Sequence, residues 1–282
     1  MKTYLDCIPC FFKQAIRAAK LLNINDENTK KLLDELGILI NQMPLESTPP
    51  EFGRIIYGKM REITRNPDPY KKLKKQSIKD ALRLYPGIIE LISKSIDPLM
   101  TAIKVAIAGN SIDFAIETDC DIEDELNRTL ENSLAINDYD QFKFKMQNAD
   151  EILYIGDNTG ESVFDKILIK QLKKPTIYVV REIPVINDVT CQDAIDSGLD
   201  EIATIVSSGT DAPGLVLNTC SNEFLKIYEN SNLIISKGQG NYEALSDEKK
   251  NMFFLLKAKC PVIAKDLDVS VGDLILKGIN TL

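Results

Sequence analysis

Short apolar runs alternate with segments of helical periodicity in the second half of the chain. Four such runs, rich in Ile, Leu, Val and Tyr, span 151–156, 176–180, 202–206 and 233–236. Apolar residues recur at helical spacing between them, at 162–172, 191–197 and 215–229. Strands that alternate with helices favour parallel pairing, because each helix crosses back over the sheet. The pattern therefore predicts an α/β fold with a doubly wound, mostly parallel sheet.

The first hundred residues follow a different pattern. Helical periodicity there predicts five helices and no strand before residue 110. These helices span 10–22, 28–41, 51–64, 72–84 and 97–108. We expect an all-helical N-terminal domain, 1–98, followed by an α/β domain, 99–282. Near the C-terminus a helix is expected from residue 242, and the apolar runs 253–256 and 261–264 both resemble strands.

Composition excludes several classes of partner. The 282 residues carry a formal charge of -8, which disfavours nucleic acid and anionic lipid. The one basic cluster, 71–75, has helical spacing and is interpreted as a solvated helix face. The sequence has no run of about 18 apolar residues and no signal peptide, so we expect a cytoplasmic protein that does not enter the membrane. The sequence does not indicate an oligomeric state.

The chain has six cysteines and no histidine. Without histidine, neither a Ser-His-Asp triad nor a Cys-His pair is available, and the commonest nitrogen ligand of zinc is missing. Ligand and acid–base chemistry must rely chiefly on carboxylates and amides, whose hard oxygen atoms favour Mg²⁺ or Mn²⁺. In a long chain without a signal peptide, we expect the cysteines to be reduced.

Polar, glycine-rich loops follow the four predicted strands, at the edge where an open α/β sheet binds ligands. Asp157 and Asn158 end the first strand, and Asp188 lies in the second loop. Two carboxylates and an amide oxygen supply half of an octahedral shell and leave positions for water and a phosphate oxygen, as Mg²⁺ prefers. The alternative is structural: Asp157 and Asn158 form a helix cap and an Asx turn, and Asp188 is an unrelated cap.

The loop after the fourth strand suits a phosphate group. Lys237 precedes Gly238 and Gly240, whose backbone amides can approach an anion closely, and the lysine adds a positive charge. Asn241 follows in the same loop. The spacing is not that of a Walker loop, and a tight turn with a surface lysine is the structural alternative.

The loop after the second strand holds two more candidates for phosphate or substrate contact, Arg181 and Asn187. An arginine at the end of a buried strand requires an anionic partner. That partner is either a phosphate group or a structural carboxylate, and the sequence leaves both open.

Two further motifs are more ambiguous. Asn110 and Asp113 follow an apolar helix, and they either face the same cleft as substrate-binding residues or belong to a glycine C-cap and turn. The sequence alone favours the turn. Cys7 and Cys10 have the spacing of half a metal site or of a redox pair, with Cys260 as a possible third thiol for a second metal site. Buried or merely reduced thiols are the favoured alternative.

Taken in order, these motifs resemble the damage-control phosphatase family, formerly known as the domain of unknown function number eighty-nine. The resemblance rests on Gly109-Asn-x-x-Asp113, Asp157-Asn-x-Gly-Glu161, Arg181-Glu-x-Pro-x-x-Asn187-Asp188-x-Thr190 and Lys237-Gly-Gln-Gly-Asn241-x-Glu243. It covers nearly the whole chain. The N-terminal segments Cys7-x-x-Cys10 and Asn66-Pro-Asp-Pro-Tyr70 are similar to the stand-alone prokaryotic branch.

The resemblance implies a helical N-terminal part, an α/β domain, and hydrolysis of small phosphate esters. The substrates it implies are damaged or overflow metabolites such as sugar phosphates. It further implies that a divalent metal ion (Mg²⁺, Mn²⁺, Co²⁺ or Ni²⁺) is held at Asp157, Asn158 and Asp188, and that Lys237 contacts the phosphate.

We therefore expect a metal-dependent phosphomonoesterase. Lys237, assisted by Arg181 and the amides of 238–241, binds the phosphoryl oxygens. The nucleophile is either water at the metal or Asp157, and Glu161, one helical turn beyond the metal loop, is the candidate general base. One alternative is an S-adenosylmethionine-dependent protein carboxyl methyltransferase, although no GxGxxG follows a predicted strand. The other is a non-catalytic sensor of a phosphometabolite or a metal.

Overall fold

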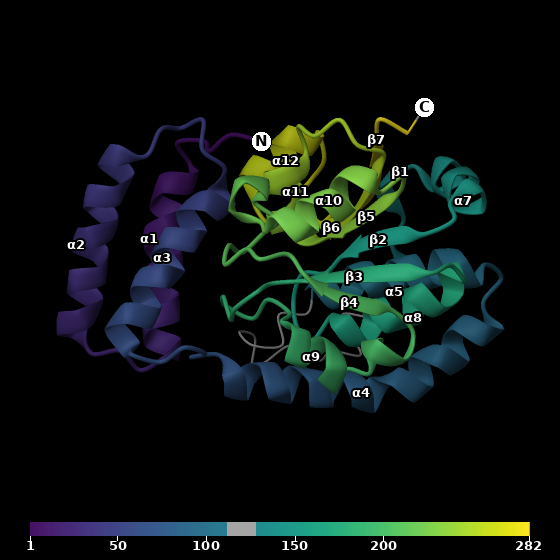
Figure 1. Cartoon of the computed structure of the whole chain (residues 1–282), viewed down its shortest axis with the longest axis horizontal. Coiled ribbons are helices and arrows are strands. Elements are labelled where there is room, and N and C mark those ends of the chain that lie inside the picture. The colour runs from purple at the N-terminus through teal and green to yellow at the C-terminus, as the bar shows by residue number, and fades with distance from the viewer. Residues whose placement is uncertain (112–127, 282) are drawn as a thin grey trace.

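The computed structural model describes residues 1–111 and 128–281. Within them a seven-stranded sheet lies between two layers of helices, and three N-terminal helices stand at one end of it (Figure 1). From residue 134 onward the chain alternates strands and helices, as the apolar pattern predicts. The predicted α/β fold with an all-helical N-terminal part is therefore confirmed.

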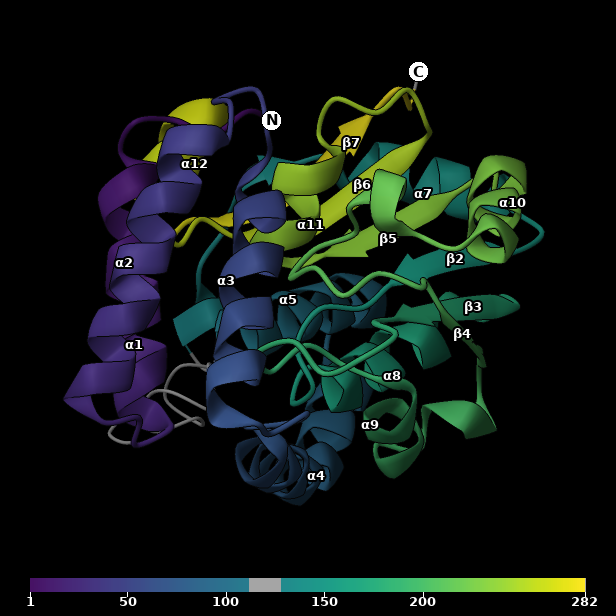
Figure 2. The same cartoon turned by 60° about the vertical axis from the view of Figure 1, so that its left-hand side comes forward.

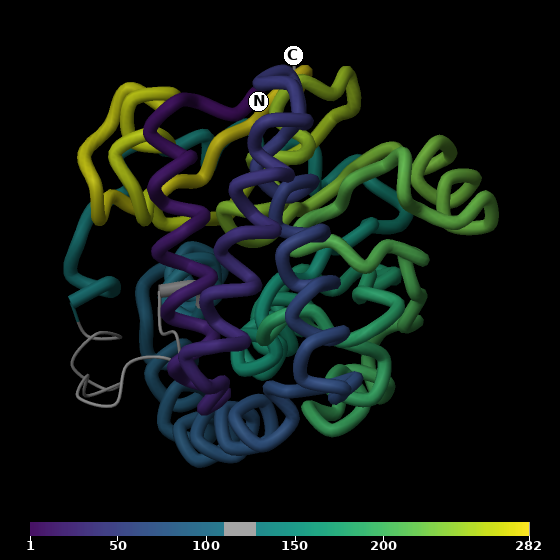
Figure 3. The backbone as a smooth tube through the Cα atoms, turned by 90° about the vertical axis from the view of Figure 1, so that its left-hand side faces the viewer, coloured from purple at the N-terminus to yellow at the C-terminus, as the bar shows by residue number. Residues whose placement is uncertain are grey.

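The three N-terminal helices run side by side and share a small apolar core (Figure 3). Their bounds are α1 Cys7–Leu21, α2 Asp26–Gln42 and α3 Pro49–Thr64. Phe11 stacks on Phe52 in this core, with ring centroids 4.8 Å apart. A capping box between Thr48 and Glu51 begins α3, and Pro49 suits its first turn because that position needs no N–H donor.

The sheet has the strand order β1-β7-β6-β5-β2-β3-β4. Its strands are β1 Leu134–Asn137, β2 Ile152–Ile155, β3 Thr176–Val180, β4 Thr204–Ser207, β5 Ile234–Lys237, β6 Met252–Lys257 and β7 Leu274–Ile279. All neighbouring pairs are parallel except β6 and β7. The chain runs outward from β2 to β3 and β4, and then returns to place β5 on the other side of β2. The order thus reverses between β2 and β5.

Helices cover both faces of the sheet because alternate residues of each strand point to opposite sides. In β2, for example, Tyr154 belongs to one apolar core and Leu153 to the other. The first core is shared with α4 Lys71–Lys94, α5 Pro98–Ser111, α7 Tyr139–Asn148, α8 Ser162–Leu172 and α9 Cys191–Asp196. The second core is shared with α10 Asn222–Asn230, α11 Gly238–Leu245 and α12 Pro261–Leu267.

Two predictions of local structure are wrong. The run 261–264 begins α12 and is not a strand, since Pro261 occupies the first helical turn, where a proline is well tolerated. The helix predicted over 215–229 begins only at α10, after Ser221 accepts a hydrogen bond from the Phe224 amide, and a single 3-10 turn, Leu217–Thr219, precedes it. The sequence patterns also missed β1, α7 and β7.

The helix α3 lies against the loops at the carboxyl ends of the strands and beside α11 (Figure 2). A Cβ atom at Gly53 of α3 would come within 2.6 Å of the Pro213 ring, and one at Gly214 would come within 3.0 Å of the ring of Pro50, also in α3. The N-terminal helices therefore roof this edge of the sheet. The division into domains 1–98 and 99–282 stays a prediction; α4 belongs to the helical part by that division but packs on the sheet.

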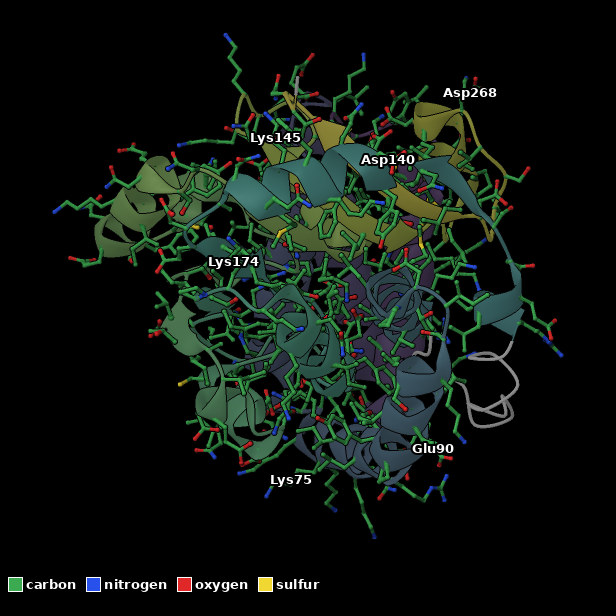
Figure 4. The ribbon with its side chains drawn as sticks, turned by 90° about the vertical axis from the view of Figure 1, so that its right-hand side faces the viewer. Lys75, Glu90, Asp140, Lys145, Lys174 and Asp268 are labelled. Carbon is green, nitrogen blue, oxygen red and sulfur yellow. The ribbon has the colours of Figure 1, made fainter. Side chains whose placement is uncertain are left out.

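The face of the molecule opposite α1–α3 carries charges of both signs. Glu90 of α4 lies low on this face, and Asp140 and Lys145 of α7 lie near its top (Figure 4). Interspersed charges of this kind are typical of an ordinary solvated surface. Of the helices in residues 1–111 and 128–281, none combines the length and the hydrophobicity that a membrane crossing needs.

Candidate active site

The loops after β2 and β3 pair with each other just beyond the sheet. The Thr159 amide donates to the Asn187 carbonyl at 2.8 Å, and the Val189 amide donates to the Asp157 carbonyl at 2.8 Å. A short antiparallel bridge joins Asn158 to Asp188. This pairing brings together Asp157, Asn158 and Asp188, the three residues that the sequence suggested as metal ligands.

These loops lie at the point where the strand order reverses. The loop after β2 and the loop after β5 leave neighbouring strands in opposite directions, which opens a crevice at the carboxyl edge of the sheet. Asn241 crosses this crevice, since its side-chain amide donates to the Gly156 carbonyl at 3.0 Å and to the Lys237 carbonyl at 2.7 Å. The first and fourth candidate loops thus belong to one site.

Arg181 extends from the end of β3 into the site and is only 1% exposed. Its Nε donates to Asp188 Oδ2 at 2.8 Å, its Nη2 donates to Asn241 Oδ1 at 3.0 Å, and Nη2 lies 3.9 Å from Asp157 Oδ1. Nη1 is buried and has no hydrogen-bond partner among the described residues. A buried guanidinium nitrogen in this state retains the capacity to bind an anion.

Lys237 is fully buried, so a surface lysine is excluded. Its ammonium donates to Glu161 Oε2 at 3.1 Å and to Asp165 Oδ1 at 2.7 Å. Asp165 also accepts from the hydroxyls of Tyr154 and Tyr178, at 2.7 and 2.8 Å. In this structure Lys237 therefore fastens β5 to the first turn of α8, and its contact with a phosphate stays a prediction.

Glu161 joins the lysine to the metal loop. Its Oε1 accepts from the Asn158 side-chain amide at 2.5 Å, and its side chain is fully buried. Burial raises the pKa of Glu161 to about 7, and the positive charge of Lys237 opposes this rise. A carboxyl group with a pKa near neutrality is suited to accept a proton during turnover.

The carboxyl groups of Asp157 and Asp188 are buried close to each other and to other acidic groups. Burial and, after it, the negative charge of the neighbouring Asp188 raise the pKa of Asp157 to about 6. Burial likewise raises the pKa of Asp188 to about 6, although Arg181 opposes the effect through its charge and its hydrogen bond. In the metal-free protein, the nearby positive charges therefore do not fully compensate the negative charges of these two carboxylates.

The donor set fits a divalent cation. Four buried carboxylates, Asp157, Glu161, Asp165 and Asp188, face two buried cations, so the cluster carries two negative charges when every group is ionised. A divalent ion would neutralise that excess, and oxygen donors are the ligands that Mg²⁺ and Mn²⁺ prefer. In the part of the chain that the structure describes, no three acidic or thiol groups alone form a metal site. A metal site at this cluster would therefore need the Asn158 amide as well as carboxylates, and the set Asp157, Asn158 and Asp188 stays a prediction.

Two glycines of the fourth loop meet specific backbone demands. Gly238 has φ +78°, a conformation that other residues rarely adopt, and it lets the chain turn directly from β5 into α11. A Cβ atom at Gly240 would come within 2.5 Å of the Pro213 carbonyl oxygen. Asn187 contributes its carbonyl to the loop pairing described above. Of the remaining candidates, Asp113 lies outside the described residues, as does the side chain of Asn110.

Three of the cysteines, Cys7, Cys10 and Cys260, lie near one another, since Cys10 and Cys260 both affect the pKa of Cys7. Burial raises the pKa of Cys7 and of Cys260, and Glu243 contributes to both shifts. Cys10 accepts a hydrogen bond from Gln14 at 3.2 Å. All the cysteines in the described residues are free thiols. A second metal site at Cys7, Cys10 and Cys260 stays a prediction.

Sequence reasoning missed two buried polar groups. Asp165 holds Lys237 and two tyrosines, and the signal for it was its position four residues after Glu161, on an otherwise apolar stretch of helix. Lys74 belongs to the basic cluster that was interpreted as solvated, but it is 1% exposed. Its ammonium lies 2.7 Å from Asp193 Oδ2 and 3.2 Å from Asp68 Oδ2, so that interpretation is wrong at this position.

Residues 3–275 match the family described as "Damage-control phosphatase ARMT1-like domain". A damage-control phosphatase of Pyrococcus horikoshii is 32% identical over 98% of this chain and 97% of its own length. A damage-control phosphatase of Archaeoglobus fulgidus is also 32% identical, over 97% of this chain and 98% of its own length. An uncharacterized protein of Methanocaldococcus jannaschii is 35% identical over 96% of this chain and 93% of its own length.

A solved structure has the same fold. The crystal structure of a DUF89 family protein from Pyrococcus horikoshii matches with a TM-score of 0.90 at 31% identity, over 99% of each chain. The sequence match and the structural match both extend over nearly the full length of the chain. The chain therefore belongs to the damage-control phosphatase ARMT1-like family.

Proposed function

We propose that this protein is a metal-dependent phosphomonoesterase that hydrolyses small phosphate esters such as sugar phosphates or damaged phosphometabolites. One observation carries the proposal: Asp157, Asn158 and Asp188 meet at the switch point of the sheet, beside a buried arginine whose Nη1 has no hydrogen-bond partner within residues 1–111 and 128–281. Oxygen ligands for a divalent cation and a nitrogen donor for an anion thus lie in one crevice. Two relatives that carry the name damage-control phosphatase agree with this reading.

Asp157, Asn158 and Asp188 would hold the divalent cation, which supplies neutralisation of the phosphoryl charge when bound. Arg181 Nη1 binds a phosphoryl oxygen, and the bonds to Asp188 and Asn241 fix the orientation of its guanidinium. Phosphoryl transfer depends mainly on such positioning and charge neutralisation.

Glu161 is the group that takes up the proton of the attacking water. During hydrolysis the oxygen of water forms a bond to phosphorus, the bond from phosphorus to the alcohol oxygen breaks, and the alcohol leaves after taking a proton from solvent. The raised pKa of Glu161 makes it a competent acceptor near neutral pH. Lys237 holds Glu161 in place through its 3.1 Å bond.

The first test is phosphate release from para-nitrophenyl phosphate and from a panel of sugar phosphates. The protein is stripped with a chelator, and Mg²⁺, Mn²⁺, Co²⁺ or Ni²⁺ is then added back. We expect activity to return with metal and to fall by about 10³-fold or more in Asp157→Asn, which removes a charged ligand. The circular dichroism spectrum of that variant should match the wild type, because the backbone pairing of the loop does not use the carboxylate.

Full activity in Asp157→Asn would contradict the assignment of the metal loop. Binding of phosphate esters without release of phosphate, with every metal, would instead favour a sensor. Tight binding of S-adenosylmethionine without metal would favour a methyltransferase.

A further inference from the structure

The start of α9 is held by a carboxylate that accepts three hydrogen bonds. Asp193 Oδ2 accepts from the Thr190 amide at 3.0 Å, from the Thr190 hydroxyl at 2.6 Å and from the Lys74 ammonium at 2.7 Å. The bond from the Thr190 amide belongs to the capping box of this helix. Asp193 is 7% exposed, so the capping carboxylate is buried together with a cation. Charge-assisted hydrogen bonds are roughly twice as strong as neutral ones, so Lys74 fixes the place of Asp193.

Lys74 reaches Asp193 from the helical part of the chain. It lies in the first turn of α4 and is 1% exposed. Its ammonium also lies 3.2 Å from Oδ2 of Asp68, which belongs to the turn between α3 and α4. Asp68 stands between two prolines, whose rings restrict the backbone, and its amide donates to Asn66 Oδ1 at 3.1 Å. The segment 66–70 thus supplies one carboxylate to Lys74, and α9 supplies the other.

Thr190 ends the segment that carries Asp188. The backbone between them is fixed on both sides. The Val189 amide donates to the Asp157 carbonyl at 2.8 Å, and the Val189 carbonyl accepts from the Arg181 amide at 2.9 Å. Thr190 itself forms a parallel bridge with Arg181. Because two peptide bonds separate Asp188 from Thr190, a movement of Thr190 shifts the Asp188 carboxylate.

We propose that Lys74 is a positioning residue for the metal site. Its bond to Asp193 holds Thr190, and Thr190 in turn holds the Asp188 carboxylate in place. This inference deepens the proposed function and rests on it for the role of Asp188 as a metal ligand. It gives the helical part of the chain a share in the geometry of the site, because α4 and the segment 66–70 supply the lysine and one of its carboxylates. The alternative is an ion pair that stabilises the fold and does not affect the metal ligands.

Binding of Mn²⁺ tests the inference independently of turnover. The chelator-stripped wild type and Lys74→Met are titrated with Mn²⁺, and binding is followed by the electron paramagnetic resonance signal of free Mn²⁺. Loss of a residue that supports a metal ligand weakens metal binding by about 10- to 100-fold. We expect the lower end of this range for Lys74→Met, because Lys74 acts through Asp193 and Thr190.

Two further variants separate positioning from stabilisation of the fold. Ile78→Ala is the matched control, because Ile78 is buried in the apolar core one helical turn farther along α4. This change should lower the melting temperature and leave the affinity for Mn²⁺ equal to that of the wild type. Thr190→Val keeps the ion pair of Lys74 but removes the 2.6 Å bond of the hydroxyl, and it should weaken Mn²⁺ binding by roughly 3- to 10-fold.

Equal affinities for Mn²⁺ in Lys74→Met and the wild type would overturn the inference, as would no binding of Mn²⁺ by the wild type. If Lys74→Met fails to fold, equal affinities in Thr190→Val and the wild type overturn it instead. The assay of phosphate release separates the two claims. If the wild type releases phosphate with Mn²⁺ and both variants bind Mn²⁺ normally, the proposed function stands and the role of Lys74 is wrong. If both variants bind Mn²⁺ more weakly but the wild type hydrolyses no phosphate ester, the positioning role stands and the proposed function is wrong.

Discussion

Replacing Lys237 with Met tests whether this lysine holds the site together or only contacts substrate. Both of its partners, Glu161 and Asp165, are 0% exposed and lie 3.1 and 2.7 Å from its ammonium. Removing one partner of a buried ion pair leaves uncompensated charge and costs about 3–5 kcal/mol. The metal-free variant should lose about that much free energy of unfolding.

The expected change in melting temperature follows from the size of the chain. Unfolding entropy of about 2.1 cal/mol/K per residue gives roughly 0.6 kcal/mol/K for 282 residues. The midpoint of thermal unfolding, followed by circular dichroism at neutral pH, should therefore fall by about 5–8 °C in Lys237→Met. The deficit should narrow at lower pH, because the two orphaned carboxylates can then take up protons.

A matched control is the exposed Lys249, for which the same substitution to Met should change the midpoint by about 1 °C or less. A midpoint within about 2 °C of the wild type for Lys237→Met would refute the reasoning. It would mean that the buried carboxylates do not need this lysine, and that its place is in substrate binding.

Two further predictions concern the dependence of stability on pH and the packing around Gly240. Burial raises the pKa of Glu161 from 4.5 to about 7, so between these values the folded protein holds a proton that the unfolded chain has lost. The free energy of unfolding of the metal-free protein should thus fall as pH rises from about 5 to about 7. In Glu161→Gln this free energy should depend less on pH near the upper end of that range. Urea denaturation that shows the free energy of unfolding rising over this range would contradict the raised pKa of Glu161. Gly240→Ala should destabilise the protein by about 1–3 kcal/mol, since its Cβ would lie 2.5 Å from the Pro213 carbonyl oxygen. Gly87→Ala, in an open stretch of α4, should stabilise it by about 0.5–1 kcal/mol in the same denaturation assay, and equal effects of the two changes would be inconsistent with the packing.

Much of the fold could be predicted from local pattern. Buried parallel strands are continuous apolar runs, and β2, β3 and β5 were recognised for this reason. The edge strand β1 was missed because its apolar run, 134–136, is only three residues long, too short to show the period of a strand. The start of α12 was mistaken for a strand because Pro261 and its apolar neighbours suit either a strand end or a first helical turn, and only packing decides between them.

The candidate site shows the same division. Polar residues after parallel strands must meet at one edge of the sheet, so Asp157, Asp188 and Lys237 could be identified as neighbours from their positions after apolar runs. What each side chain does there was not predictable. Lys237 was expected at the surface or on a phosphate, whereas the structure buries it between Glu161 and Asp165.

The sequence by itself determined the class of fold, the set of polar loops and the absence of histidine, which leaves oxygen atoms as the main donors. These are properties of residue type and short-range spacing. The tertiary structure decided which loops are neighbours, because the placement of β5 beside β2 is a long-range choice that no local period encodes. That placement also buries Lys237 between Glu161 and Asp165, since burial depends on which strand and helix lie alongside.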